Sequence, residues 1–570
     1  MSTPARKHHH IPIVGMFRTY QRRYFRFDLI AGLVLASMLV PQGMAYAELT
    51  GLPAVTGIYT TIAALIAYSV FGPNRQLILG PDSSLAPVIA VVILPLAAGD
   101  PATAVALASA LSIIAGLICI AAGYLRVGVI TELLSKPIRI GYLNGIAVIV
   151  FISQLPKALG FSVDGGTTID ILVGTFSGVA AGEMVPAALA LSAGSVLLIV
   201  GLRRVSKTIP GVVFAAVGSI GAVALFDLVN RGVKTVGSIP AGLPPLTFPG
   251  VDIDMLPALL GGAVAVALVS FADTGALSTA TALKSGVRVD PNSEIKALGA
   301  ANLLSGVFQG FPTSASSSRT AVAMAVGART QLAGLIAAAG VVVIIVVFPG
   351  LVAEMPAATL AAIVITASFT LFDWAGTLWL FRARRSEFLL SIGAFLGVLL
   401  LGILEGIALA ILLALANFVR KSWLPHSAEL GRVEGISGYH DRERHPEAEV
   451  VPGLLIIRFD APLFFANAPR FGRRLQEMLR SADRPIDRIL IVGNAITDID
   501  TTGAEILSDV LDDLDARGVS FAFAGLKGPE KDRLRAYGLS ERIGVANFYP
   551  NTISAVESYE RSRREQGNST

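Results

Sequence analysis

The feature that most constrains the fold of this chain is a polar stretch, FPTSASSSRT at residues 311–320, set between long apolar segments. It carries six hydroxyl side chains and one arginine. The apolar run that follows, 321–326, is far shorter than the roughly 20 residues that a straight membrane span needs. A charge inside a membrane is costly unless it serves a purpose. A short helix with a polar start is typical of transporters, in which the positive end of the helix dipole points at an anion.

Composition indicates a polytopic membrane protein with a soluble domain at its C-terminal end. Of the 570 residues, 53% are hydrophobic and only 15% are charged, which excludes an ordinary soluble chain. Arg, Asp and Glu become frequent after about residue 452. Residues 1–28 are basic and show no cleavable signal pattern, so we expect a cytoplasmic N-terminal segment. Cys119 is the single cysteine, which excludes an internal disulfide and a cysteine-based metal site.

The apolar segments fall into two sets of seven, separated by a polar break rich in Pro and Gly at 230–254. The third segment of each set is the most interrupted, and paired broken segments are the best sequence sign of inverted repeats. Because seven is odd, the two repeats must be inverted relative to each other. The first set lies at 29–47, 55–71, 83–97, 103–124, 137–155, 186–202 and 209–228. The second lies at 255–283, 295–308, 316–326, 332–348, 357–372, 387–401 and 403–419.

Loop charges predict the orientation of these spans. If the chain starts inside and alternates, only Lys157, Arg231 and Lys234 fall in outer loops. An excess of Lys and Arg on the inner side is what the positive-inside rule demands, so both termini are predicted in the cytoplasm of a bacterial inner membrane. The inner loops hold Arg75, Arg126, Lys136, Arg139, Arg203, Arg204, Lys207, Lys284, Arg288, Lys296, Arg329, Arg382, Arg384, Arg385, Arg420 and Lys421.

These patterns divide the chain into a membrane domain at 29–424, a charged linker at 425–451 and a small α/β domain at 452–562. Within the membrane domain, the repeats cover about 29–228 and 255–420. In the last domain, strand-like and helix-like patterns alternate, which is typical of an α/β fold. Strands are predicted at 454–459, 463–465, 488–492 and 519–524, and helices at 468–479, 502–517, 531–537 and 552–561.

Short motifs along nearly the whole chain resemble one family. They are PQGMAYA at 41–47, GLP at 51–53, GIY at 57–59, RQL at 75–77, GP at 80–81, FP at 311–312, SRTAV at 318–322, GARTQL at 327–332 and DAPLFFAN at 460–467. The sequence resembles the SulP anion transporters, also called the sulfate permease or solute carrier 26 family, with a C-terminal STAS domain. The resemblance implies fourteen spans in two inverted seven-span repeats, split into core and gate subdomains, and usually a homodimer. It also implies transport of anions such as sulfate, bicarbonate, chloride or dicarboxylates.

The two broken segments are predicted to form an anion site. One half-helix begins near Ser314 and the other near Asp82 or Ser83, and their free N–H groups and dipoles face each other. Arg319 adds positive charge or a direct contact. The alternative is that Arg319 snorkels or pairs with an acid as part of the structure, and that the serines allow close helix packing. The hydroxyls expected to donate hydrogen bonds are those of Ser314, Ser316, Ser317 and Ser318.

Two further positions of the first half are predicted to take part. Gln42 and Tyr46 are four residues apart and so share a helix face. The resemblance places a glutamine and an aromatic of the first span in the site, while an interhelical hydrogen bond with packing is the structural alternative. By the resemblance, many family members carry an apolar or small residue at the position of Asp82. A carboxylate that faces an anion repels it. We therefore expect Asp82 either to cap the half-helix or to carry a proton, and its presence argues against simple sulfate selectivity.

Asp273 lies well inside an apolar segment, and acids within a membrane are default candidates for proton or ion coupling. Burial among apolar groups favours the protonated form of a carboxyl group. A sodium site is the competing interpretation. A hard cation needs several oxygen ligands, and the residue one turn on is Leu277, followed by Ser278. Proton coupling is therefore the preferred interpretation.

Thr501 and Thr502 open a predicted helix in the C-terminal domain and are good N-cap residues. By the resemblance to anti-sigma-factor antagonists, a hydroxyl at this place can be phosphorylated, which suggests a regulatory role. The chain has no Walker loop, no GxGxxG and no metal-ligand pattern. We therefore expect neither enzyme activity nor a cofactor nor nucleic-acid binding, and the inner loops explain the basic balance.

The sequence thus predicts a secondary active anion transporter that takes up sulfate with protons by alternating access. Its partners would be a small inorganic anion, protons, membrane lipid, a second copy of the chain and a cytoplasmic protein bound by the STAS domain. Transport of bicarbonate or C4-dicarboxylate, with sodium coupling, is the first alternative. Anion exchange, a passive channel, and a sensor with vestigial transport are the others.

Overall fold

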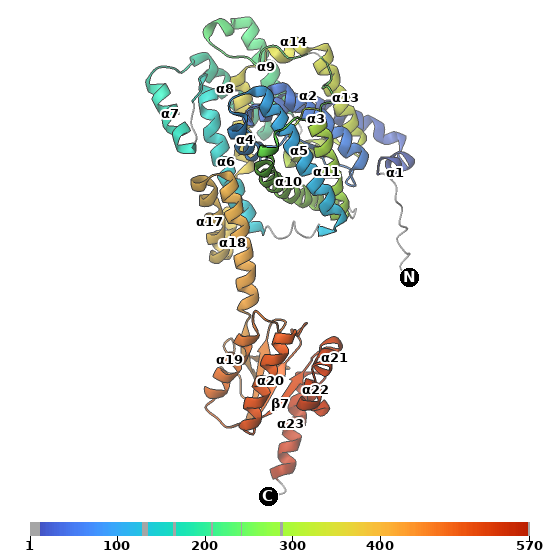
Figure 1. The fold of residues 1–570 in the computed structure, drawn as a ribbon, viewed down its shortest axis with the longest axis vertical. Coiled ribbons are helices and arrows are strands. Elements are labelled where there is room, and N and C mark those ends of the chain that lie inside the picture. The colour runs from blue at the N-terminus through green and yellow to red at the C-terminus, as the bar shows by residue number, and fades with distance from the viewer. Residues whose placement is uncertain are drawn as a thin grey trace. The chain divides into compact units, whose positions relative to one another are not determined.

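The computed structural model in Figure 1 describes residues 12–127, 135–163, 167–206, 209–240, 242–285 and 289–567. The chain divides into two compact units, Met1–Ala414 and Leu415–Thr570. The first is helical, and the second combines a sheet with helices. Both observations confirm the fold class expected from the sequence.

Each of the fourteen expected apolar segments overlaps one helix of the structure. In the first set these are α2 (Phe25–Leu49), α3 (Ala54–Phe71), α4 (Ala86–Ala97), α5 (Pro101–Tyr124), α6 (Lys136–Leu159), α8 (Pro186–Val205) and α9 (Gly211–Phe226). In the second they are α10 (Leu256–Ser285), α11 (Pro291–Val307), α12 (Ser317–Val326), α13 (Leu332–Val347), α15 (Ala357–Leu371), α17 (Arg385–Leu401) and α18 (Ile403–Trp423).

Some helices were not expected from the sequence, because they are short or carry little apolar periodicity. They are α1 (Pro12–Thr19), α7 (Thr168–Ala180), α14 (Pro349–Ala353) and α16 (Trp374–Ala383). Within the described part of the chain, eight helical segments are long and apolar enough to cross a membrane by themselves. The broken helices α4 and α12 have only 12 and 10 residues, in keeping with the expectation of half-helices at these positions.

Glycines allow helices of the first unit to approach closely, which is a common way to pack helices in membranes. At the crossing of α2 and α3, a Cβ added to Gly57 would lie 1.9 Å from the carbonyl oxygen of Gly43. The crossing of α5 and α11 is similar, since a Cβ on Gly299 would lie 2.6 Å from the carbonyl oxygen of Gly116. The contact between Gly43 and Gly57 helps to fix the position of α2, on which Gln42 and Tyr46 lie.

We expect Gly57→Ala to lower the thermal unfolding midpoint of the detergent-solubilised protein, because the added methyl group forces α2 away from α3. Overpacking of this kind costs about 1–3 kcal/mol. Gly218→Ala in α9 is the matched control, since nothing lies within 4 Å of a Cβ at that position. Equal midpoints for the two variants would show that the α2–α3 crossing adjusts freely.

The second unit is built on a six-stranded sheet of strand order β4-β3-β5-β6-β7-β8, in which β5 to β8 are parallel and β3 and β4 antiparallel. One face packs on α19 and α20, through residues such as Phe471 and Leu507, and the other on α23 through Val556. The strands are β3 (Ser427–Arg432), β4 (Tyr439–Asp441), β5 (Gly453–Phe459), β6 (Ile486–Val492), β7 (Ser520–Ala524) and β8 (Phe548–Tyr549). The helices are α19 (Ala468–Arg480), α20 (Thr501–Ala516), α21 (Gly528–Ala536), α22 (Leu539–Ile543) and α23 (Thr552–Gly567).

Two details of the C-terminal prediction differ from the structure. The linker expected at 425–451 instead supplies β3 and β4, because Ala428 and Leu430 face a core while Glu429 between them remains half-buried. Glu429 accepts hydrogen bonds of 2.6 Å from both Arg442 and Arg484, so the charges that suggested a linker are paired in the fold. The strand expected at 463–465 is a single bridge and a turn. The chain turns there into α19.

Candidate anion-binding site between two broken helices

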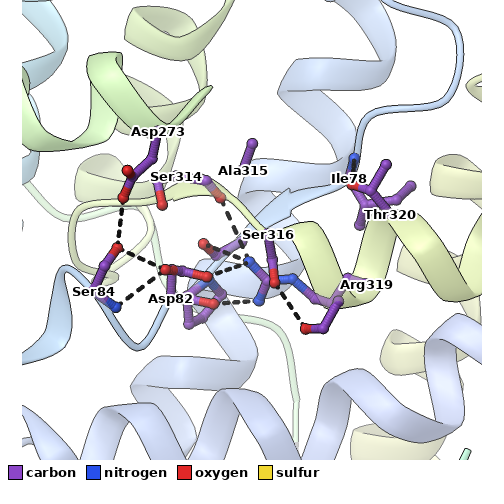
Figure 2. Close-up of polar contacts among 12 residues, drawn as sticks. Ile78, Asp82, Ser84, Asp273, Ser314, Ala315, Ser316, Arg319 and Thr320 are labelled. Carbon is purple, nitrogen blue, oxygen red and sulfur yellow. Dashed lines mark hydrogen bonds and ion pairs between the residues drawn. The ribbon is translucent and has the colours of Figure 1, made fainter. Parts of the chain in front are cut away.

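A short antiparallel pair of strands holds the two broken segments together. In β1 (Leu79–Gly80) and β2 (Ser314–Ala315), Leu79 pairs with Ala315 and Gly80 with Ser314. The pairing continues where the Ser316 amide donates to the Ile78 carbonyl at 3.3 Å. Figure 2 shows the turn at Asp82 and Ser84, which leads into α4, beside the first residues of α12. This is the meeting of two half-helix starts that the sequence predicted.

The side chain of Arg319 links the two broken segments where β1 pairs with β2. The side chain is 1% exposed, and its guanidinium donates to the carbonyl oxygens of Pro81 and of Gly80, the latter at 3.3 Å. A third, longer contact of 3.5 Å reaches the carbonyl of Ser314, and Nη2 lies 3.7 Å from a carboxylate oxygen of Asp82 (Figure 2). The pairing with an acid, which was the structural alternative, is therefore what the structure places here. The guanidinium is therefore held by groups of the protein itself.

A cavity of about 740 Å³ lies beside the crossing, a size suited to a small ligand with water. Its wall includes Ala276 and Leu277 of α10 and Ala321 and Val322 of α12. Of the sequence-predicted site residues, it brings together Gln42, Tyr46, Asp82, Ser83, Asp273, Ser316, Ser317 and Ser318. Ser314 and Arg319 are not among the residues that line it; Ser314 is fully buried in β2.

The start of α12 offers hydrogen-bond donors to the cavity. The first intrahelical bond runs from the Thr320 amide to the Ser316 carbonyl, at 3.0 Å, so the three amides of 317–319 have no acceptor within the helix. The hydroxyls of Ser316 and Ser318 lie 3.1 Å apart, and Ser316 makes no side-chain cap on its own helix. Amides, hydroxyls and the helix dipole together form a site that favours negative charge.

Asp82 occupies the corresponding start of the other broken segment. Its carboxylate accepts hydrogen bonds from the Ser84 amide at 3.1 Å and from the Ser84 hydroxyl at 2.7 Å, and its carbonyl accepts from the Ala86 amide at 3.0 Å. These contacts close the turn that leads into α4. The carboxylate thus has a local hydrogen-bonding role and a partner in Arg319, which answers part of the objection that it repels an anion.

Ser84 was not singled out from the sequence, yet it joins two of the residues that were. Its hydroxyl oxygen lies 2.9 Å from a carboxylate oxygen of Asp273 on α10, in addition to its contact with Asp82 (Figure 2). The neighbour of Asp273, Thr274, accepts a hydrogen bond from the Ala315 amide at 3.1 Å and so ties α10 to β2. The available signal was the Asp-x-Ser spacing, because Asp side chains bind the backbone two residues on.

Basic side chains also line the cavity. Lys136 and Arg139 come from α6 and Arg203 from α8, and the acid Asp373 lines it as well. Such a cluster raises the local concentration of anions. The sequence marked these three cations as inner-loop residues and did not assign them to the site, because only the tertiary fold brings the ends of α6 and α8 beside α10 and α12.

Glu294 is a buried acid that sequence reasoning missed. It is 2% exposed on α11, where it accepts hydrogen bonds from the Tyr68 hydroxyl at 2.5 Å and the Ser278 hydroxyl at 2.8 Å. Asn74 donates to the same Ser278 hydroxyl at 3.1 Å. Glu294 does not line the cavity, so we regard this hydrogen-bond network as a structural link between α3, α10 and α11.

In the C-terminal unit, the predicted hydroxyl cap of α20 is wrong. Asp500 is the N-cap, and its carboxylate accepts hydrogen bonds from the Gly503 amide at 2.7 Å and the Phe465 amide at 2.8 Å. A carboxylate is already ionised and reaches both amides, whereas one hydroxyl oxygen does not. Thr501 is exposed and Thr502 half-buried in the first turn. Their regulatory role stays a prediction.

We expect Asp500→Ala to destabilise the C-terminal unit by about 1–2 kcal/mol, the range for loss of an N-cap. Two amides lose their acceptor in this variant. Thr501→Ala is the matched control and should leave stability unchanged, because the hydroxyl is exposed. Protease resistance of residues 415–570 in the full chain measures both. An equal loss of stability in the two variants would show that Thr501 contributes as much to the cap of α20 as Asp500 does.

Comparison with known proteins gives the same family for both units. The profile of the sulfate permease family matches residues 25–394, and that of the STAS domain matches 445–555. A probable sulfate transporter of Mycobacterium tuberculosis is 38% identical over 550 residues, which are 96% of this chain and 98% of that protein. These matches confirm the resemblance inferred from the sequence motifs.

Two solved structures are similar in fold. Murine Solute Carrier 26 family member A9, an anion transporter solved in the inward-facing state, matches with a TM-score of 0.88 at 20% identity, over 97% of this chain and 94% of that one. The transmembrane domain of a cyanobacterium bicarbonate transporter matches with a TM-score of 0.60 at 25% identity, over 69% of this chain and 98% of that one.

Proposed function

This chain belongs to the sulfate permease family of anion transporters, and on that basis we propose that it takes up sulfate together with protons by alternating access. Its relatives are multi-pass membrane transporters rather than enzymes. The mycobacterial relative named as a probable sulfate transporter supports sulfate as the substrate. We place the protein in the bacterial inner membrane as a homodimer with both termini in the cytoplasm.

The observation that carries this proposal is the composition of the cavity wall. Free amides and hydroxyls at the start of α12 favour an anion, and Asp273 stands in the same cavity as the acid that accepts a proton. An anion and a proton bound in one cavity attract each other, so each raises the affinity for the other. Such reciprocal coupling is what symport requires.

The basic side chains of the cavity wall support an inward-open arrangement. Lys136, Arg139 and Arg203 are residues that the positive-inside rule assigns to the cytoplasmic side. Because they line the same cavity as the start of α12, we infer that this cavity opens toward the cytoplasm. In the outward-open state, movement of the core against the gate would open the site on the other side.

Bicarbonate is the second candidate substrate. The fold likeness to the transmembrane domain of a bicarbonate transporter favours it, and the amides and hydroxyls of the site bind either anion. Sodium would then be the coupling ion. A competition series with unlabelled bicarbonate, C4-dicarboxylates and chloride against labelled sulfate ranks these substrates.

Uptake by the purified protein in liposomes tests the proposal. We expect accumulation of labelled sulfate when the outside is made acidic, and none when the proton gradient is collapsed. A sodium gradient at equal pH is the control. Uptake driven by sodium and indifferent to pH would overturn proton coupling, and steady current beyond carrier turnover would favour a channel.

For the STAS domain we propose a regulatory role through Thr501 or Thr502 and a cytoplasmic partner. The exposure of Thr501 at a helix N-terminus supports it, because a phosphate is favoured at that end of a helix. Thr501→Glu compared with Thr501→Ala, each measured by sulfate uptake, tests the role. Equal uptake rates in the two variants would count against it.

A further inference from the structure

We propose that Asp82 and Asp273 share a single proton through the hydroxyl of Ser84, so that the coupling site is a bridged pair of carboxyl groups. This inference rests on the proposed proton coupling and deepens it. It assigns Asp82, the residue that departs from the family pattern, to proton binding together with Asp273. It also assigns a role to Ser84 as the bridge.

The count of hydrogen atoms carries the inference. The Ser84 hydroxyl oxygen lies 2.7 Å from an oxygen of Asp82 and 2.9 Å from an oxygen of Asp273. A hydroxyl has one proton to donate, and an ionised carboxylate can only accept. If both carboxyl groups were ionised, one of these two short contacts would have no hydrogen in it. One carboxyl group must therefore bring a proton and donate to Ser84.

The surroundings decide which carboxyl group holds the proton at rest. Arg319 on α12 lies 3.7 Å from Asp82, and the Ser84 amide donates to the same carboxylate at 3.1 Å, so the charge of Asp82 is stabilised. Asp273 has its described hydrogen bond to Ser84 alone. The resting proton therefore lies on Asp273. The other ionisable groups that face the pair or share its cavity are Tyr46 of α2, Lys136, Arg139 and Tyr142 of α6, Arg203 of α8, and Asp373 at the start of α16.

Transfer across the bridge conserves the hydroxyl. The O–H bond of Asp273 breaks as its proton passes to the Ser84 oxygen, while the original Ser84 proton passes to Asp82. The net result moves one proton from α10 to the start of α4 and leaves Ser84 unchanged. Both carboxyl groups contact the same hydroxyl oxygen, so ionisation of both would bring two like charges together, which is unfavourable.

The pair also explains how an anion is accepted beside two acids. One guanidinium and two carboxylates carry a net negative charge, which the shared proton neutralises. The donors of α12 then attract an anion without opposition from the pair. Loss of the proton toward the cytoplasm restores the negative charge and expels the anion, so a single proton controls both binding and release.

Infrared difference spectroscopy of the full-length, substrate-free protein in lipid at neutral pH tests the pair directly. We expect the band of one protonated carboxyl group to be lost in Asp273→Asn and shifted in Ser84→Ala. It should also be lost in Asp82→Asn, because Ser84 is then free to donate to Asp273. Ser84→Thr keeps a hydroxyl and should restore the wild-type band. Glu294 is unchanged in all variants, so its signal cancels.

A carboxyl band that is unchanged in both Ser84→Ala and Asp82→Asn would overturn the proposal. A spectrum that is unchanged in Asp273→Asn would also overturn it. The measurement does not depend on transport. If the carboxyl band changes as expected in a protein that shows no proton-driven uptake of sulfate, that result would refute the proposed function but would still support a proton shared by Asp82 and Asp273.

Anion binding at varied pH gives an independent readout. The proton concentration at half-maximal binding of sulfate should change about tenfold in Ser84→Ala, the effect of one hydrogen bond to a charged group. Ser270→Ala is the matched control, because the Ser270 hydroxyl of the same helix α10 donates to its own helix at Val266, 2.7 Å away. An equal change in both variants would overturn the assignment of the bridge.

Discussion

Replacing Asp273 with Asn will abolish proton-driven uptake of sulfate, to the level of protein-free liposomes, while exchange of sulfate for sulfate persists. The amide has nearly the shape of the carboxyl group and still reaches Ser84, so the cavity keeps its form. It carries no ionisable proton, so the anion loses the partner that couples it to the gradient. The donors of α12 that hold the anion are unchanged.

Two flux measurements on the same liposomes check this result: uptake against an imposed pH difference, and exchange of labelled for unlabelled sulfate at equal pH. Asp254→Asn is the matched control, since Asp254 is an exposed acid just before α10. Unchanged driven uptake in Asp273→Asn would make Asp273 a structural residue. Loss of both fluxes would make it a ligand of the anion rather than the coupling group.

Replacing Arg319 with Met will destabilise the membrane unit by about 3–5 kcal/mol, the usual cost of removing one partner of a buried ion pair. The methionine fills much of the volume but donates nothing. Asp82 loses its charged partner, and the carbonyls of Gly80 and Pro81 lose their hydrogen bonds at the point where the two repeats cross. The starts of α4 and α12 then no longer stay together, and anion binding is lost with them.

Thermal unfolding and size-exclusion profiles of the solubilised protein measure this effect. Adding Asp82→Asn to Arg319→Met should recover part of the stability, because no unpaired charge is left, and the double-mutant cycle isolates the pair's contribution. Arg319→Lys should fall between, since an ammonium cannot span several acceptors as a planar guanidinium does. A stable Arg319→Met protein with weaker anion binding alone would show that Arg319 is a direct ligand.

The fold followed from local patterns because membrane helices are encoded locally. A run of apolar residues must satisfy its own backbone hydrogen bonds, so each of the fourteen segments is readable without its neighbours. Errors arose where burial is shared between distant residues. The stretch 425–451 looked like a linker because its charges, such as Glu429 and Arg442, find partners only in the assembled sheet. The stretch 463–465 has the apolar pattern of a strand, but Leu463 forms a single bridge, to Ile499, and the chain then turns.

The residues of the candidate site form two similar groups. Some are indicated by the sequence, and others are brought to the site only by the tertiary fold. Asp82, Ser83, Asp273 and the serines of α12 could be named because polar residues in or beside apolar segments stand out, and Gln42 and Tyr46 because the family resemblance points to them. Ser84 could not be ranked above its neighbours, since its importance depends on α10 lying within hydrogen-bond reach. The cations Lys136, Arg139 and Arg203 are predicted from the sequence as inner-loop charges, which stays a prediction, and their place in the cavity wall depends on the tertiary fold.

By itself, the sequence determined that this protein has two inverted halves with broken third segments, basic residues gathered in alternate loops and a C-terminal α/β domain. Those properties depend on composition and periodicity along the chain. Only the tertiary structure decided which polar groups meet. The pairing of β1 with β2 turned Arg319 inward onto Asp82 and two carbonyls, leaving the α12 donors for the anion. It also brought Ser84 between two acids that lie 191 residues apart in the sequence. The number of protons in a hydroxyl-bridged contact depends on distances in space, which periodicity along the chain does not encode.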